Sequence, residues 1–229
     1  MSIEKNIETL KKSLVKAAFK SGREPNEITL MAVTKNHGKD SVLQASAAGI
    51  TCFGENRVQE AFSKYNDIPE AANLHLIGHL QSNKVAKAVE LFNWIDSVDS
   101  IKLLQKINHS AEKLDKVIQI LIEVNGSGES AKFGFASELE VISAMEMSQS
   151  LSHIRVRGLM TMGPLGSDEE STRKVFSSLK NTFDKVKAGF KGLQIDVLSM
   201  GMSGDWIIAV EEGSTLIRVG TAIFGARQT

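Results

Sequence analysis

The sequence predicts an α/β fold: a single (β/α)8 barrel of the TIM type with an extra N-terminal helix. Eight short β-favouring apolar runs recur along the 229 residues, and segments with apolar residues at helical spacing lie between them. No low-complexity, strongly charged or Pro/Gly/Ser-rich stretch divides the chain, so residues 1–229 are expected to form one domain. Alternation of strand and helix favours a parallel sheet with right-handed crossovers. A doubly wound open sheet is the alternative.

The first expected element is an amphipathic helix over residues 3–21. One of its faces carries Ile3, Ile7, Leu10, Leu14, Ala17 and Ala18, which should dock on the barrel. The candidate strands follow at residues 28–34, 50–54, 74–78, 93–98, 117–124, 154–162, 195–201 and 216–220. The candidate helices between them cover residues 39–48, 56–65, 82–92, 100–114, 136–150 and 171–190. Expected helix N-caps are Ser82, Ser100 and Ser137.

Composition excludes several classes of function. Lys plus Arg and Asp plus Glu both number 27, so the chain lacks the cationic excess expected of a nucleic-acid-binding protein. No apolar run approaches the ~18 residues that span a bilayer, and the first residues lack the apolar segment of a secretory signal. The single cysteine, Cys52, cannot form an internal disulfide, and no Cys/His cluster offers a metal site. We expect a cytoplasmic protein that binds no metal, membrane or nucleic acid.

In a barrel of this kind, functional residues lie at the carboxyl ends of the strands, and phosphate sites are commonest after strands seven and eight. Ser199, Gly201 and Ser203 follow the seventh candidate strand, and Gly220 and Thr221 end the eighth. Small residues let backbone N–H groups close on an anion, and hydroxyls add donors. These stretches therefore indicate a phosphate cradle. The alternative is that both are tight turns that need glycine for backbone reasons.

Lys35 directly follows the apolar run of the first strand, which places its amine at the mouth of the barrel. A lysine in a partly desolvated pocket can attack an aldehyde to form a Schiff base. Together with a phosphate cradle, Lys35 indicates a phosphorylated aldehyde ligand. Pyridoxal 5′-phosphate (PLP) is the leading candidate, followed by a sugar phosphate in an aldolase. A lysine that merely extends into solvent is the alternative.

Three further side chains are candidates for the same site. Arg218 lies two residues before Gly220, so both should face the barrel interior. Its guanidinium could bond a pyridine nitrogen or pair with a structural carboxylate. Asn56 could donate to a phenolate oxygen or cap the following helix. His75 is interpreted as a core or rim histidine, because no carboxylate neighbour is visible in the sequence.

Seven stretches of the chain match, in order, the pattern of a known family. They are the segment AVTK ending at Lys35 and residues 53–60, 74–84, 121–134 with Glu129 and Lys132, 157–162, 199–205 and 213–227. Together they resemble the pyridoxal phosphate homeostasis protein family of the YggS/PROSC type. The resemblance implies a single-domain barrel similar to the N-terminal barrel of alanine racemase. It also implies PLP binding without a securely assigned catalytic activity.

The resemblance further implies that Lys35 carries the Schiff base, that Arg218 faces the pyridine nitrogen and that Asn56 lies close to the ring. The residues that it places around the phosphate are Ser199, Gly201, Ser203, Gly220 and Thr221. The chain departs from the family pattern in two places. Family members commonly have Ser-Lys-Thr-Lys-Pro where residues 34–38 read Thr-Lys-Asn-His-Gly, and proline where this chain has His79.

A carrier of PLP and a small PLP-dependent amino-acid racemase remain as functions. An arginine at the pyridine nitrogen, with a pKa above ~12, leaves the ring neutral and a poor electron sink, which favours the carrier. Racemisation needs a second base opposite Lys35, and alanine racemases take a tyrosine from a domain that this chain lacks. The single tyrosine, Tyr65, lies ~15 Å along its helix from Asn56, which places it too far from the site.

As a carrier, the protein is expected to act in intracellular vitamin B6 homeostasis and to store PLP or deliver it. Candidate partners are enzymes that require PLP and have not yet received it. A second lysine at the mouth, Lys84 or Lys132, could assist release by competing for the aldehyde. Without the second domain of the racemases, which makes their dimer contact, a monomer is expected.

Overall fold

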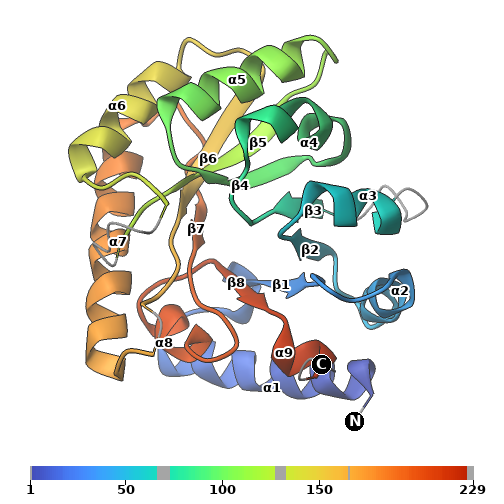
Figure 1. The fold of residues 1–229 in the computed structure, drawn as a ribbon. Helices are drawn as coiled ribbons and strands as arrows, with labels where there is room; N and C mark the ends of the chain where they lie inside the picture. Colours follow the sequence, from blue (N-terminus) through green and yellow to red (C-terminus); the bar gives the residue numbers. More distant parts are fainter. Residues whose placement is uncertain (1, 66–72, 127–132, 165, 226–229) are drawn as a thin grey trace.

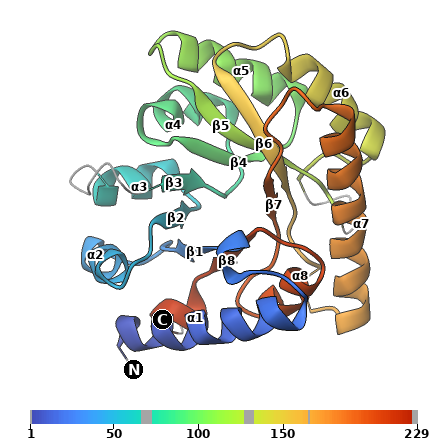
Figure 2. The ribbon, with the colours of Figure 1, turned by 180° about the vertical axis from the view of Figure 1, so that it is seen from behind.

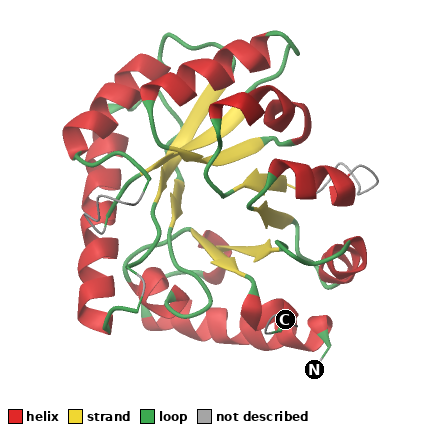
Figure 3. Cartoon of the chain, in the orientation of Figure 1, coloured by secondary structure: helices red, strands yellow, loops and turns green. Residues whose placement is uncertain are grey.

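The computed structural model describes residues 2–65, 73–126, 133–164 and 166–225. Eight parallel strands close into a barrel in chain order, which confirms the predicted fold class. The strands are β1 Thr29–Val33, β2 Cys52–Glu55, β3 Asn73–Leu76, β4 Trp94–Val98, β5 Ile118–Glu123, β6 Ile154–Met160, β7 Val197–Ser199 and β8 Leu216–Val219. They form the centre of the molecule, and the helices surround them (Figure 1, Figure 3).

The first seven described helices lie where the apolar periodicity predicts them, whereas the last two are additional to the predicted set. The helices are α1 Ile3–Lys20, α2 Lys39–Ala47, α3 Val58–Tyr65, α4 Val85–Leu91, α5 Ile101–Glu112, α6 Glu138–Ser148, α7 Glu169–Gly189, α8 Trp206–Glu211 and α9 Thr221–Phe224, with 3-10 turns η1 Pro25–Glu27 and η2 Ser82–Lys84. Two N-caps are confirmed, because the Ser100 and Ser137 hydroxyls accept from the N–H groups of Leu103 and Glu140. The Ser82 cap is wrong: this residue begins η2, and Gln81 occupies the cap position.

Helix α1 docks on the barrel as predicted. Its buried face consists of Ile7, Leu10, Leu14, Ala17 and Ala18. The helix runs beside α8 and the short α9, so the first and the last described helices lie next to each other (Figure 1, Figure 2). The Asn6 amide donates to the Ile223 carbonyl at 2.8 Å, which ties α1 to α9.

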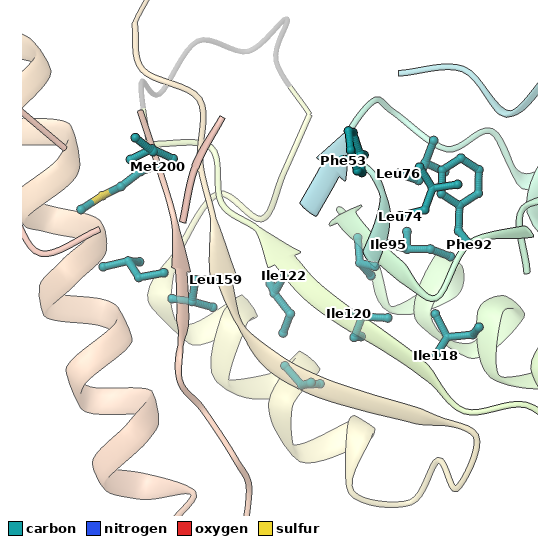
Figure 4. Close-up of a cluster of buried hydrophobic side chains, with 14 of the residues drawn as sticks. Phe53, Leu74, Leu76, Phe92, Ile95, Ile118, Ile120, Ile122, Leu159 and Met200 are labelled. Atoms are coloured by element: carbon teal, nitrogen blue, oxygen red, sulfur yellow. The ribbon is translucent and has the colours of Figure 1, made fainter. Parts of the chain in front are cut away.

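Alternation along the strands divides the core into two layers. Outward-facing side chains pack against the helices, and Figure 4 shows part of this layer, including Phe53, Leu76, Ile120 and Leu159. A smaller inner cluster, which fills the barrel below its carboxyl end, consists of Met31, Cys52, Leu121, Met160 and Leu216. Buried polar side chains, among them His75, Asp96 and Arg218, accompany this apolar cluster.

No helix in the described part of the chain is long and apolar enough to cross a membrane.

Candidate functional site

A cavity of about 260 Å³ opens at the carboxyl ends of the strands, where the fold class places function. Alternation along β1 turns Met31 and Val33 inward, and Lys35 continues this row into the cavity. Its polar lining includes Lys35, Asn56, Ser203, Arg218 and Thr221, and its apolar lining consists of Val33, Ile77, Met160, Met162 and Met202. The cavity thus combines one amine, one guanidinium and two hydroxyls over a floor of apolar side chains.

The structure brings six of the eight predicted site residues to this cavity: Lys35, Asn56, Ser203, Arg218, Gly220 and Thr221. Arg218 and Gly220 face the same side, as strand alternation predicts. Ser199 and Gly201 lie behind the cavity wall. Ser199 is fully buried. Gly201 has φ +93°, and a Cβ there would come within 2.5 Å of the Ala209 Cβ, so glycine is needed for packing against α8.

Arg218 is a deeply buried charge in the cavity wall, with 4% of its surface exposed. Its Nη1 donates to Ser199 Oγ at 2.6 Å, and its Nη2 donates to the Thr161 carbonyl at 2.8 Å. These bonds hold the guanidinium plane across the end of β8. Burial lowers the pKa of Arg218, and nearby carboxylates oppose this effect. Because an arginine pKa starts above ~12, the side chain remains charged near neutral pH.

Glu123, at the end of β5, is one of those carboxylates. It is 3% exposed. Burial, reinforced by the charge of Asp99, raises its pKa to about 7, and Arg218 opposes the shift. Apart from its position at a strand end, nothing in the sequence indicates the environment of this residue. Glu123 therefore changes charge close to neutral pH within reach of the site.

The Tyr65 side chain reaches the residue next to Lys35. The distance along α3 back to Asn56 does not reveal this approach, because the side chain extends across to the neighbouring strand. Its hydroxyl lies 2.7 Å from Thr34 Oγ1, on the residue that precedes Lys35. Tyr65 does not line the cavity, and burial raises the pKa of its hydroxyl. Tyr65 therefore stays outside the cavity wall, as predicted, although its hydroxyl contacts the residue beside Lys35.

His75 has the carboxylate neighbour that the sequence analysis did not find. Its Nδ1 lies 2.9 Å from Asp96 Oδ1, and its ring stacks on Trp94. Burial disfavours the charged imidazole, but Asp96 and Cys52 together oppose this effect and raise the pKa of His75 to about 10. Strand register could have found this pair, because His75 aligns with Trp94 and Asp96 faces inward two residues later. The pair belongs to the barrel core, as predicted for His75.

The two departures from the family pattern place aromatic contacts beside the mouth. Asn36 adopts φ +64°, and the His37 ring stacks on Phe224 with centroids 4.6 Å apart. The His79 ring stacks on Phe133 at 3.6 Å, and its Nδ1 lies 3.0 Å from Asp99 Oδ2. Both histidines thus contribute to the rim of the mouth.

Of the two lysines that could assist release of the ligand, Lys84 and Lys132, the structure describes only Lys84. Lys84 lines a neighbouring hollow of about 350 Å³ that shares Asn56 with the Lys35 cavity. Lys132 lies outside the described residues, as does Glu129.

A larger hollow, of about 640 Å³, lies at the opposite end of the barrel. Its two arginines, Arg155 and Arg157, already bond protein groups.

Among the described residues, no group of three or more His, Cys, Asp or Glu side chains is arranged to hold a metal ion. The residues at the cavity instead suit an organic ligand with an electrophilic carbon and an anionic group. Lysine supplies a nucleophile, arginine a fixed donor, and Ser203 and Thr221 supply hydroxyl donors.

Comparison with known proteins defines the class first. The alanine racemase N-terminal domain family matches residues 2–228. A curated relative from Vibrio alginolyticus, named pyridoxal phosphate homeostasis protein, is 41% identical over 231 residues, covering 99% of this chain and 98% of the relative. The chain belongs to the pyridoxal phosphate homeostasis protein family, within the alanine racemase N-terminal class. The curated relatives are named as homeostasis proteins and not as enzymes.

Two solved structures share the whole barrel. PipY of Synechococcus elongatus PCC7942, solved with PLP bound, superposes with a TM-score of 0.85 at 35% identity and covers 98% of this chain and 100% of its own. A protein of unknown function from Bifidobacterium adolescentis gives a TM-score of 0.90 at 36% identity and covers 97% and 94% of the two chains. The likeness therefore extends over nearly the whole length of the chain.

Proposed function

We propose that this protein binds PLP through a Schiff base on Lys35 and serves intracellular PLP homeostasis. The single observation that carries the proposal is the convergence of the Lys35 amine, the fixed Arg218 guanidinium and two hydroxyls on one cavity. Family membership and the PLP-bound state of PipY support the choice of ligand. When bound, PLP supplies an aldehyde that condenses with a lysine amine.

Each residue of the cavity has a proposed part in holding this ligand. Ser203 and Thr221, with the backbone of Gly220, bind the phosphate. A Cβ at Gly220 would lie 3.3 Å from the Val33 carbonyl, so that position is already closely packed. Arg218 donates to the pyridine nitrogen, and Asn56 lies beside the ring. Ser199 and Gly201 act from behind the wall, where Ser199 orients Arg218 and Gly201 shapes the turn before α8.

The proposed role is that of a carrier. A guanidinium held by Ser199 and Thr161 donates a hydrogen bond to the pyridine nitrogen but does not give up its proton, so the ring stays a weak electron sink. Carbanion chemistry at a bound amino acid is therefore disfavoured. We propose that the protein acts in the cytoplasm as a monomer and passes PLP to enzymes that lack it.

Absorption spectroscopy of the purified protein tests the proposal. Adding PLP should produce a band at the edge of the visible range that differs from the band of free PLP, and Lys35→Ala should abolish it. Lys102→Ala removes an exposed lysine on α5 and is the matched control, which should retain the band. A band that persists unchanged in Lys35→Ala would show that another group holds the ligand.

The alternative function, an amino-acid racemase, predicts exchange of the substrate α-proton. Incubation of the PLP-loaded protein with alanine or serine in D₂O, followed by NMR, measures this exchange. The carrier proposal expects no exchange above that of free PLP. Turnover of order 1 per second or faster, ordinary for an enzyme, would contradict it.

A further inference from the structure

A buried polar cluster lies outside the cavity wall, between the end of β1 and helix α3. We call it the α3 clamp, and its members are Thr34, Glu55, Glu60, Lys64 and Tyr65. Thr34 and Glu55 are fully buried, and Lys64 and Tyr65 are 7% and 6% exposed. None of the five lines the Lys35 cavity. The proposed function assigns them no part.

On the amino side of Lys35, the clamp holds the carbonyl and the hydroxyl of Thr34. The Lys64 ammonium donates to the Thr34 carbonyl at 2.8 Å. The Thr34 hydroxyl donates to Glu55 Oε1 at 2.6 Å and lies 2.7 Å from the Tyr65 hydroxyl. The end of β1 is therefore fixed from two directions immediately before the lysine.

On the carboxyl side of Lys35, the clamp holds the next peptide group. The Asn36 backbone N–H donates to Glu60 Oε1, and the Lys64 ammonium donates to the same oxygen. Asn36 has φ +64°, a left-handed conformation that asparagine tolerates better than most other non-glycine residues, and the Glu60 contact holds its N–H there. Lys64 thus links the contacts on both sides of Lys35 through a single ammonium group.

Burying the charged groups of the α3 clamp costs free energy, so stability of the fold alone does not explain the arrangement. Burial raises the pKa of Glu55, and its Oε2 has no hydrogen-bond partner among the described residues. Buried ion pairs are often replaceable by apolar residues without loss of stability, whereas removing one partner is costly. A rigid polar support behind a functional side chain is, by contrast, what accurate positioning requires.

We infer that the α3 clamp positions Lys35, so that Lys64 and Tyr65 are positioning residues for capture of the aldehyde. This inference rests on the proposed function of Lys35. Because the peptide groups on both sides of Lys35 are held by hydrogen bonds, its amine moves only by rotation about the side-chain bonds. Loss of the clamp frees the backbone as well and makes capture slower and weaker.

The test uses Lys64→Met and Tyr65→Phe in the full-length protein. The readouts are the dissociation constant for PLP and the rate at which the absorbance band forms after mixing. We expect the dissociation constant to rise about tenfold for Lys64→Met and by a smaller factor for Tyr65→Phe, with slower band formation in both. Tyr65→Phe retains the ring that packs edge-on to Phe53, so it is the variant expected to fold normally.

Lys116→Met is the matched control, because Lys116 also donates to two backbone carbonyls, those of Val89 and Glu90, far from the site. It should bind PLP like the unmodified protein. Wild-type affinity and rate in folded Tyr65→Phe and Lys64→Met would overturn the inference. Failure of the proposed function gives a different pattern, in which the unmodified protein and Lys35→Ala show the same spectrum with PLP.

Discussion

At the scale of single residues, the serine that ends β7, Ser199, and the serine that follows it, Ser203, have different roles. Ser203 lines the cavity, whereas Ser199 is buried and accepts a hydrogen bond from Arg218. Ser203→Ala should weaken PLP binding about tenfold through loss of one donor to the phosphate, with little change in stability. Ser199→Ala should lower the free energy of unfolding by about 2 kcal/mol, because a bond to a buried charge is lost.

Urea denaturation and PLP titration of both variants measure this division of roles. Each serine variant acts as the control for the other. A larger loss of affinity in Ser199→Ala than in Ser203→Ala, at equal fold integrity, would mean that the phosphate lies nearer β7 than proposed.

Glu123 makes stability depend on pH. Its pKa is raised from 4.5 to about 7, so between these values the native protein binds more protons than the unfolded chain. The free energy of unfolding contributed by Glu123 therefore falls as the pH rises through this window, by up to about 3 kcal/mol. Glu123→Gln cannot ionise and should lose this decline.

Urea denaturation of PLP-free protein at intervals from pH 4.5 to 8 measures the difference. The control is Glu146→Gln, at an exposed position on α6, which should follow the unmodified protein. Equal pH dependence in Glu123→Gln and the unmodified protein would contradict the shifted pKa.

The place of a residue at the site is predictable from the sequence when it depends only on position and alternation within its own strand. It is not predictable when the side chain reaches another element. Lys35, Arg218 and Gly220 follow from strand ends and alternation alone, and the structure brings them to one cavity. The contacts of Tyr65 and Asp96 do not, because they depend on which neighbouring strand each side chain reaches. Spacing within one helix or strand carries no such information.

At the scale of elements, the close approach of β6 and β7 depends on a residue without a side chain. A Cβ at Gly158 would lie 1.8 Å from the Val197 carbonyl. Gly158→Ala must therefore push the strands apart and should cost about 3 kcal/mol of stability. Gly189→Ala, in α7 with open space around it, is the control and should be neutral or stabilising by up to about 1 kcal/mol.

Thermal and urea denaturation of the two glycine variants provide the measurement. Similar stabilities for both would show that β6 and β7 can separate at no cost.

The elements themselves were largely predictable, since apolar periodicity identifies the eight strands and the long helices. The boundaries of the elements were less predictable. The seventh strand was expected over 195–201, but β7 covers only Val197–Ser199, because the chain turns at Gly201 to meet α8. Such a turn is dictated by packing between elements and not by the local pattern.

At the scale of the whole molecule, the residues that stabilise the barrel and the residues of the proposed site lie in different parts of it. The inner cluster and the His75–Asp96 pair fill the interior, and the outward layer packs on the helices. The carboxyl end is left for the Lys35 cavity, with α3 supporting it from outside. Closure of the barrel brings the last strand beside the first, so Arg218 from β8 faces the same cavity as Lys35 from β1.

The central claim is that Lys35 is the point of attachment for PLP, and the most direct measurement is chemical trapping. The protein is mixed with PLP, reduced with borohydride, digested and mapped by mass spectrometry. A sample reduced in the absence of PLP provides the background. The label is expected on the peptide that contains Lys35, at close to one label per chain. Labelling concentrated on Lys84, Lys132 or any other lysine, or spread evenly over exposed lysines, would contradict it.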